Sequence, residues 1–300
     1  MFILAGDIGG TTARFGVYDE QYSLSTYKEV PTTTISSFQQ TTRKLFEEFS
    51  KEGFILRAVS IAFAGPVNKH GASLTNQDLN VTRKELGLLP VQKTYLLNDV
   101  EAYGYGVTQG NHEHLTGPEK GKGTKAVLTV GTGVGKAIIA SQTPPLVLPS
   151  EGGHKEPPYS VLSYLKEESE EEIGVLTIED ILGGRNIQKI HKVLTGKDES
   201  LEEIFGGENN KTINFIRKTL TVVARNFALT TKCEGGLYLG GGVIQKHPSL
   251  LHRLKTRFSE HPTHRELLQN IPLYKVNNPQ TGLKGAAVYA TQYDDRHKHR

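Results

Sequence analysis

The sequence predicts an α/β protein with two lobes, and three observations support this fold class. The chain has 300 residues, which is more than one typical domain contains, and 36% of them are hydrophobic, enough to bury sizeable cores. Short apolar strands alternate along the chain with helical patterns. One arrangement, a strand hairpin with a glycine-rich turn followed by later strands and helices, begins near Phe2 and recurs near Ala126 without any residue-level repeat.

The first third of the chain indicates a β-meander followed by alternating helices and strands. Strands are expected where short apolar runs stop at Gly, Pro, Asn or Asp, and helices where apolar residues recur at helical spacing or a capping-box pattern occurs. The expected strands are Phe2–Ala5, Arg14–Tyr18, Leu24–Val30, Ala58–Ala64 and Lys93–Leu97. The expected helices are Ile35–Phe49, a short one opened by Thr82–Glu85, and Val100–Tyr105.

The rest of the chain is expected to repeat the plan with longer helices. The same criteria apply, and Lys211–Thr231 is the longest helical pattern. The expected strands are Ala126–Val130, Lys136–Ala140 and Gly236–Leu239. The other expected helices are one that contains Glu179 and is capped by Thr177, and the Ala-rich Leu283–Tyr293.

Charge and cysteine content exclude several classes of protein. The 35 basic and 32 acidic residues nearly cancel, and no basic block interleaved with aromatic residues is present, so we expect no nucleic-acid partner. Cys233 is the single cysteine, so an intramolecular disulfide or a cysteine-based zinc cluster cannot form. The apolar start reaches Asp7 too soon for a secretion signal, and no stretch has the length of a bilayer span. We therefore expect a cytoplasmic protein with no membrane partner.

Two glycine-rich turns are candidates for binding phosphate, because backbone N–H groups can approach a phosphate where no Cβ blocks them. The second is not a P-loop: three residues rather than four separate Gly131 from Gly135, and Ala137 stands where a P-loop needs Ser or Thr. A strand rather than a helix is expected to follow. The alternative is that both are ordinary hairpin turns. The two turns are Gly9-Gly10-Thr11-Thr12 and Gly131-Thr132-Gly133.

Five motifs together resemble the bacterial glucokinase family. They occur in the family's order over about residues 3 to 290, which is essentially the whole chain. One departs from the family pattern, because Thr12 stands where the family usually has Asn, and a hydroxyl can still form a hydrogen bond. The motifs are Asp7-Ile8-Gly9-Gly10-Thr11, Leu97-Asn98-Asp99, Gly131-Thr132-Gly133, Glu151-Gly152-Gly153-His154 and Leu239-Gly240-Gly241-Gly242.

The resemblance implies a two-lobed ribonuclease-H-like fold, the actin-like ATPase fold, with ATP and sugar meeting in an interlobe cleft. The small lobe would comprise residues 1–104 and 286–300, and the large lobe residues 105–285. The implied activity is ATP-dependent phosphorylation of glucose at its 6-hydroxyl, with ATP and Mg²⁺ as cofactors. Dimers are common in the family, so a homodimer is one of the oligomeric states left open.

The resemblance also implies a role for each nucleotide-site residue. Asp99 matches the catalytic aspartate, the base for the sugar hydroxyl; as a residue just past a strand, it could instead be a helix N-cap. Asp7 would hold Mg²⁺ through water, because Mg²⁺ keeps several waters and takes few carboxylates. The phosphate clamp would consist of Gly9, Gly10, Thr11 and Thr12, with Gly131, Thr132 and Gly133. The adenosine turn would consist of Gly240, Gly241 and Gly242.

A further set matches the family's sugar-contacting positions. Carboxylates accept from sugar hydroxyls, whereas Asn and His can donate or accept, so a buried set of such groups selects for hydroxyl positions. His154 could instead be a surface histidine, and Glu179 a first-turn carboxylate favoured by the helix dipole. Asn76 could equally be an ordinary loop residue. The set is Asn98, Glu151, His154 and Glu179, with Asn76 as an additional candidate.

Two other functions compete with a glucokinase. One is a kinase for a related hexose, mannose or fructose, and the other is a nucleotide-driven protein of the actin or chaperone kind that binds no sugar. Asp99 together with Glu151 and His154 favours a sugar kinase, because a filament or chaperone ATPase needs no sugar carboxylates. The single cysteine excludes the zinc cluster of a sister family of sugar kinases and repressors. Hexose selectivity, the use of ADP or polyphosphate in place of ATP, and regulation stay open at this point.

Overall fold

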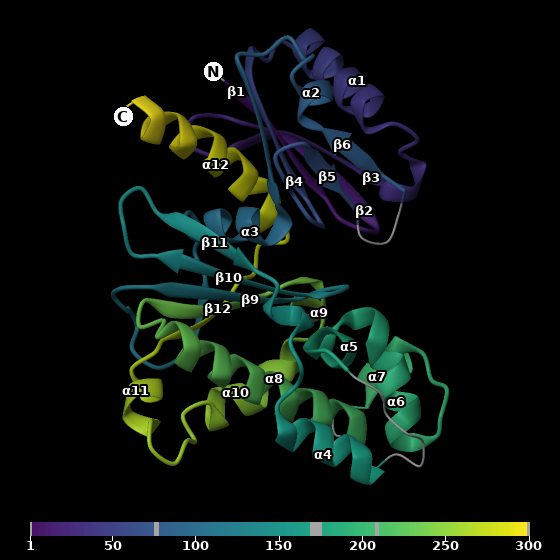
Figure 1. Cartoon of the computed structure of the whole chain (residues 1–300), viewed down its shortest axis with the longest axis vertical. Helices are drawn as coiled ribbons and strands as arrows, with labels where there is room; N and C mark the ends of the chain where they lie inside the picture. Colours follow the sequence, from purple (N-terminus) through teal and green to yellow (C-terminus); the bar gives the residue numbers. More distant parts are fainter. Residues whose placement is uncertain (1, 75–77, 169–175, 208–209, 299–300) are drawn as a thin grey trace. The chain divides into compact units, whose positions relative to one another are not determined.

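The computed structural model describes residues 2–74, 78–168, 176–207 and 210–298 (Figure 1). The chain divides into two compact units. Unit 1 comprises Met1–Gly110, Thr143–Val147 and Gln280–Arg300, and unit 2 comprises Asn111–Gln142 and Leu148–Pro279. Each unit contains its own sheet, so the α/β fold class predicted from the sequence is confirmed.

Unit 1 contains a five-stranded sheet in the order β3-β2-β1-β4-β7. The first three strands form the predicted antiparallel meander, whereas β1, β4 and β7 are parallel. The interior strand β4, which lies between β1 and β7, is buried on both faces, and this explains why its sequence is an apolar run without alternation. The strands are β1 (Phe2–Ile8), β2 (Thr12–Tyr18), β3 (Leu24–Pro31), β4 (Leu56–Phe63) and β7 (Lys93–Asn98).

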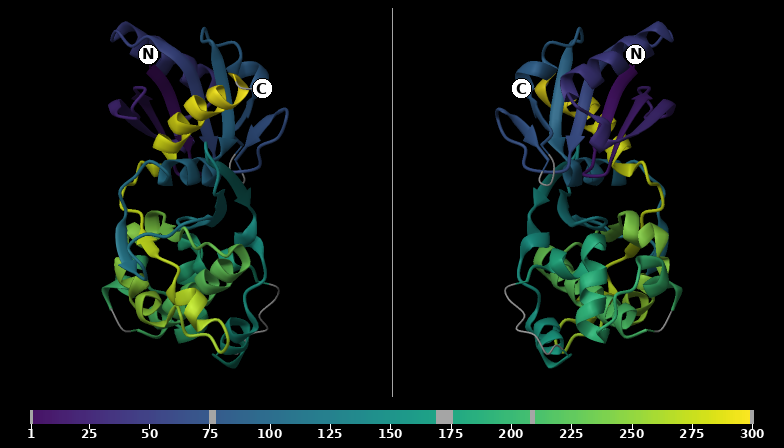
Figure 2. Two further views of the ribbon diagram at one scale, coloured as in Figure 1. Left: turned by 90° about the vertical axis from the view of Figure 1, so that its left-hand side faces the viewer. Right: turned by 90° about the vertical axis from the view of Figure 1, so that its right-hand side faces the viewer.

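Helices α1 (Phe38–Lys51) and α12 (Thr281–Lys298) cover opposite faces of this sheet (Figure 2). Leu4 and Ile8 of β1 belong to the same apolar cluster as the buried side of α1. Asp7, on the other face of β1, approaches Gly282 at the start of α12. The remaining elements of unit 1 are η1 (Thr32–Thr34), β5 (Gly71–Ser73), β6 (Asn80–Thr82), α2 (Arg83–Leu86) and α3 (Asp99–Val107).

Unit 2 is built on a six-stranded sheet in the order β11-β10-β9-β12-β13-β8. Strands β9 and β10 form the second predicted hairpin, and β12 lies parallel to β9 on its other side. The strands are β8 (Glu113–Thr116), β9 (Lys125–Val130), β10 (Val134–Ala140), β11 (Leu146–Ser150), β12 (Gly236–Gly240) and β13 (Leu273–Lys275).

Helix α8 (Lys211–Thr231) supplies much of the apolar core of unit 2. Its bounds are those that the sequence predicts. The other α-helices of this unit are α4 (Tyr159–Glu168), α5 (Ile178–Leu182), α6 (Ile187–Thr195), α7 (Leu201–Gly206), α9 (Gly242–Lys246), α10 (His252–Arg257) and α11 (Arg265–Gln269). The 3₁₀ turns are η2 (Gly152–His154), η3 (Gly184–Asn186) and η4 (Pro248–Leu251).

Helix caps explain which predicted helix boundaries are confirmed and which are wrong. The capping box of Thr82 and Glu85 is confirmed, as is the Thr177 cap of α5. The predicted start of the first helix at Ile35 is wrong, because the Ser37 side chain accepts from the Gln40 N–H and α1 begins at Phe38. No helix in the described ranges is long and apolar enough to cross a membrane.

Candidate active site

In unit 1, the first glycine-rich turn joins β1 to β2 and is held by the residues around it. The Gly9 N–H donates to the Thr12 carbonyl at 3.0 Å, which closes the turn. Thr32 braces it twice: its hydroxyl donates to the Gly9 carbonyl at 2.7 Å, and its N–H donates to the Thr11 carbonyl at 3.0 Å. A Cβ built on Gly10 meets no atom within 4 Å, so the tip of the turn is open to a ligand.

Asp99 lies at the same edge of the unit 1 sheet as this turn. Strands β1, β4 and β7 are parallel, with Ile8 beside Phe63 and Phe63 beside Asn98, so their carboxyl ends meet. Asn98 is the N-cap of α3: its Oδ1 accepts from the N–H groups of Val100 and Glu101 at 2.9 and 3.3 Å. The alternative that Asp99 is the N-cap is therefore wrong, and Asp99 is instead the first residue of the helix.

Asn98 has less free hydrogen-bonding capacity than the sequence suggests. Besides capping α3, its Nδ2 donates to the Gly65 carbonyl at 3.2 Å, so one amide hydrogen is already used. Because Asn98 ends β7 and is the N-cap of α3, it fixes the position of the next residue, Asp99, at the start of the helix. Asn76, the additional candidate for a sugar contact, lies outside the described residues.

Asp7 is a partly buried carboxylate on the α12 side of β1. Burial raises the pKa of Asp7 to about 6, and the guanidinium of Arg14, its partner across the β1–β2 register, opposes this shift. A Cβ at Gly282 would lie 2.8 Å from Oδ2 of Asp7, so a glycine at that position leaves space for the carboxylate. Because burial makes the negative charge costly, a cation beside it would be stabilising.

In unit 2, the second glycine-rich turn joins β9 to β10 and lies beside the third. The Gly131 N–H donates to the Gly133 carbonyl at 2.9 Å, and the Gly131 carbonyl accepts from the Gly184 N–H at 2.8 Å. Because β9 and β12 are parallel, the turns that follow them are neighbours, and a Cβ on Gly131 would lie 3.8 Å from the Gly242 nitrogen. Thr132 at the tip is exposed.

The third turn needs glycine at its centre. Gly241 has a φ of +93°, and a Cβ there would lie 2.5 Å from the Val130 carbonyl oxygen. Either fact alone disfavours any other residue. Gly240 ends β12 and Gly242 begins α9, so the sequence pattern Gly240-Gly241-Gly242 is a strand-to-helix turn.

Glu179 lies against the second turn. Its Oε2 accepts from the Val134 N–H at 2.9 Å, and its Oε1 accepts from the guanidinium of Arg185 at 2.7 Å. A Cβ on Gly133 would lie 2.4 Å from Oε2, so the turn closes over the carboxylate. Both oxygens therefore have partners within unit 2, although each retains a second lone pair.

Glu151 and His154 are brought together by the 3₁₀ turn η2, as their spacing predicts. Their side chains are 84% and 56% exposed, and Nε2 of His154 lies 3.8 Å from Oε2 of Glu151. The two glycines between them pack against β10: a Cβ on Gly153 would lie 2.0 Å from the Val134 carbonyl oxygen. This packing leaves the two polar side chains on the open side of the turn.

Lys136 of β10 holds the same turn from beneath, a role that the sequence did not reveal. Its side chain is 5% exposed, its Nζ donates to the Gly152 carbonyl at 3.0 Å, and Nζ lies 5.3 Å from the centre of the Phe227 ring. Burial lowers the pKa of Lys136 to about 8, and the charge of Lys155 acts in the same direction. The sequence signal that could have indicated its burial is its position two residues after Val134, on the same face of an apolar strand.

The burial of Lys136 should give stability a specific pH dependence. The pKa falls from 10.5 to about 8 on folding, so between these values the unfolded chain binds more protons and the free energy of unfolding rises with pH. The full rise should be about 3 kcal/mol. In urea unfolding, the free energy of unfolding of Lys136→Met should not show this rise with pH. Lys189→Met, which removes an exposed lysine of α6, should show the same rise as the wild type. Equal slopes for wild type and Lys136→Met would show that the ammonium is not desolvated.

The two sheets with their glycine-rich turns form an α/β fold of the actin-like ATPase kind, which solved glucokinases share. A glucokinase from an Antarctic psychrotroph has this fold, with a TM-score of 0.78 at 22% identity over 98% of this chain and 99% of that one. A glucokinase from Balamuthia mandrillaris, solved in complex with glucose, has a TM-score of 0.72 at 22% identity over 96% and 92% of the two chains.

Sequence comparison defines the family more closely. Residues 4–293 match the Glucokinase family. A glucokinase from Agrobacterium fabrum is 30% identical over 96% of this chain and 91% of its own length, and one from Chelativorans sp. is 28% identical over the same shares. The chain belongs to the glucokinase family, so the predicted family and its enzyme class are confirmed.

Proposed function

We propose that this protein transfers the γ-phosphoryl group of ATP to the 6-hydroxyl of glucose, with Asp99 as general base. The observation that carries the proposal is the position of Asp99, the first residue of α3, at the sheet edge where the Gly9–Thr12 turn also lies. A carboxylate there can accept the proton of an attacking hydroxyl, while the turn binds the phosphate charge.

Backbone N–H groups would provide most of the phosphate binding. The Gly9–Thr12 turn has an open tip, and Thr32 fixes its shape before any ligand arrives. The Gly131–Gly133 turn is fixed in the same way by Gly184 and Glu179. Donors that are fixed in advance need little reorganisation as charge develops on the transferred group. The neighbouring Gly240–Gly242 turn supports an adenosine site, because glycines let a flat base lie against the backbone.

The sugar hydroxyls would be held by Glu151 and His154, with Glu179 and Asn98 as further contacts. Glu151 and His154 lie on the open side of η2, where a hydroxyl can reach both. Each Glu179 oxygen can accept one more bond beyond those from Val134 and Arg185. Asn98 retains one amide hydrogen for a hydroxyl oxygen.

Asp7 fits a role beside a magnesium ion. Its carboxylate is partly buried and its pKa of about 6 leaves it mostly charged at neutral pH, where a cation would offset the cost of burial. Mg²⁺ takes few carboxylates and keeps several waters, so one such group suits it. When bound, Mg²⁺ would neutralise phosphate charge, and Asp7 would orient one of its waters.

The test is a coupled assay of phosphorylation over a panel of hexoses and phosphate donors. ATP with glucose should give the highest kcat/KM. A clear preference for mannose or fructose would make the protein a kinase of that hexose. ATP hydrolysis that no sugar increases would instead favour a nucleotide-driven protein of the actin or chaperone kind and would overturn the proposal.

Metal removal should abolish turnover and leave folding intact. Excess EDTA should stop phosphorylation, and Mg²⁺ added to metal-free protein should restore it without any zinc, because the donor proposed here is a single oxygen ligand. The circular dichroism of the chelated protein should be unchanged. Activity that survives complete chelation would remove both Mg²⁺ and Asp7 from the proposed roles.

A further inference from the structure

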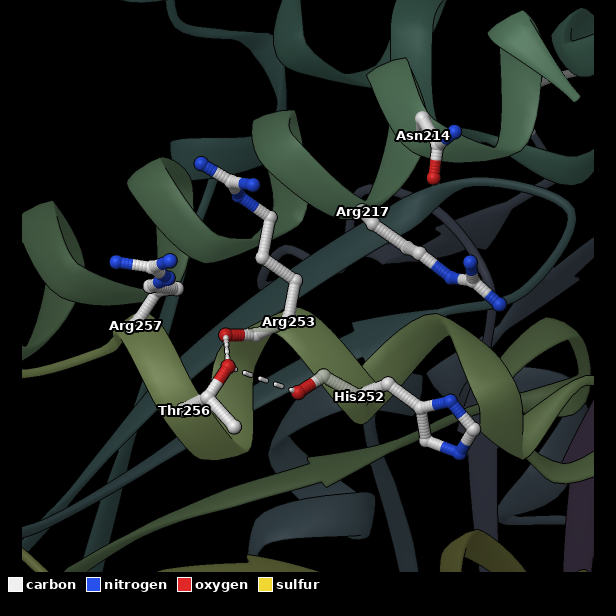
Figure 3. A pocket seen from close by; sticks show the side chains of 6 residues that line it. All are labelled: Asn214, Arg217, His252, Arg253, Thr256 and Arg257. Carbon is white, nitrogen blue, oxygen red and sulfur yellow. Dashed lines mark hydrogen bonds between the residues drawn. The ribbon is translucent and has the colours of Figure 1, made fainter. Parts of the chain in front are cut away.

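A pocket of about 390 Å³ lies in unit 2 and is lined by none of the residues assigned above. It is formed between helices α8 and α10 (Figure 3). The lining contains three arginines and a histidine but no carboxylate. The lining residues are Asn214 and Arg217 of α8 and His252, Arg253, Thr256 and Arg257 of α10.

Arg217 is the buried member of this set. It is 8% exposed, and its Nε donates to the Ser249 carbonyl at 3.1 Å, which fixes the direction of the guanidinium. A buried guanidinium is costly unless it has anionic or hydrogen-bonding partners. Its presence in the lining means that the pocket has a buried cationic group in addition to exposed ones.

The positive charge around the pocket exceeds the negative charge. Arg257 is paired with Glu260, and this pairing is the main cause that lowers the pKa of Glu260, with the charge of Arg253 acting in the same direction from beyond ion-pair distance. Burial is the main cause that lowers the pKa of Arg225, and the positive charge of nearby Arg253 lowers it further. Among the described residues, Glu260 is the carboxylate that pairs with this group of arginines.

The polar residues of the lining suit an oxyanion. The Thr256 hydroxyl donates to the carbonyls of Arg253 and His252 at 3.2 and 3.4 Å (Figure 3), so its oxygen is oriented and can still accept. Arg253 and Arg257 are one helical turn apart on α10, so their guanidinium groups lie on one side of the helix. Planar guanidinium groups match the oxygens of a phosphate, which can accept from several at once.

We propose that this α8–α10 pocket binds a phosphate group, either as inorganic phosphate or as the phosphate of a small phosphorylated metabolite. The volume of the pocket lies within the range of small-molecule sites. The pocket is therefore larger than free phosphate alone requires. The inference does not rest on the proposed kinase reaction, since none of the lining residues has a role there.

The experiment is calorimetric titration of the whole protein with inorganic phosphate and, separately, with glucose 6-phosphate in the presence of saturating glucose. Potassium chloride at matched ionic strength is the control for screening. Arg253→Gln and Arg257→Gln should each weaken phosphate affinity by roughly 10- to 100-fold, the effect of losing a charged hydrogen bond. Arg265→Gln, which removes the same charge from α11 outside the pocket, should leave affinity within about twofold.

The two titrants distinguish the sources of the phosphate. Equal affinities that both depend on Arg253 would indicate inorganic phosphate, and tighter binding of the sugar phosphate that also depends on Arg253 would indicate a metabolite. The proposal is wrong if phosphate binds no better than chloride, or if Arg253→Gln and Arg265→Gln bind it equally well. Because Arg253 and Arg257 are exposed, neither substitution should unfold the protein, and circular dichroism checks this.

Discussion

Replacement of Asp99 by Asn should lower the turnover number by roughly 10²–10⁴-fold, the usual contribution of a positioned general base. The amide has nearly the shape of the carboxylate but cannot accept the hydroxyl proton. Asn98, not Asp99, caps α3, so the substitution leaves the cap intact and the helix should keep its start. Steady-state kinetics with glucose and ATP would measure the effect, and glucose affinity measured without ATP should change little.

Glu101→Gln provides the matched control for this prediction. Glu101 lies in the same first turn of α3, so its neutralisation removes a similar interaction with the helix dipole. If Asp99 acts only by stabilising the helix, both variants should lose similar stability and keep similar turnover. Unchanged turnover in Asp99→Asn would remove Asp99 from the mechanism.

The strand-and-turn framework could be predicted from the sequence because its signals are local. An apolar run that ends in glycines predicts a strand followed by a tight turn, and all three such turns are found after β1, β9 and β12. Gly241 shows why the pattern is reliable, since its positive φ and its approach to Val130 both exclude a side chain. A capping box such as Thr82 with Glu85 is equally local.

Contacts between distant elements could not be predicted in this way. Lys136 fits an exposed strand position as well as a buried one, and only the packing of β10 against Gly152 and Phe227 buries it. Glu179 and Arg185 are six residues apart across α5 and η3, so no helical spacing indicates their pairing. The α8–α10 pocket combines residues that are far apart in sequence, and its arginines have no motif.

Asn98 and Asp99 show a further reason why the sequence alone could not assign the site, because the same residue types serve as helix caps and as catalytic groups. The sequence left the N-cap of α3 open between a structural and a catalytic interpretation of Asp99. The structure assigns the cap to Asn98 through two backbone hydrogen bonds. This assignment favours a separate role for Asp99, although the role itself stays a prediction until turnover is measured.

Glu151→Gln should weaken apparent glucose affinity by roughly 5- to 150-fold, the effect of one unmade hydrogen bond in a site that the bound sugar closes to water. The amide keeps the shape but replaces one acceptor oxygen with a donor, so a sugar hydroxyl loses its partner. The carboxylate is 84% exposed, so folding should be unaffected. Calorimetry with glucose alone would measure the change, and affinity for ATP without sugar should move little.

The control for Glu151→Gln is Glu156→Gln, an exposed carboxylate five positions further along the chain that has no assigned role. It removes the same charge from a nearby exposed position in the sequence, so a general electrostatic effect would appear in both variants. Lys136→Met gives a second comparison, because Lys136 holds the Gly152 carbonyl beneath Glu151 and should affect glucose affinity in the same direction. Weakened ATP binding with intact glucose affinity in Glu151→Gln would place the η2 turn in the nucleotide site, and its assignment to the sugar would then be wrong.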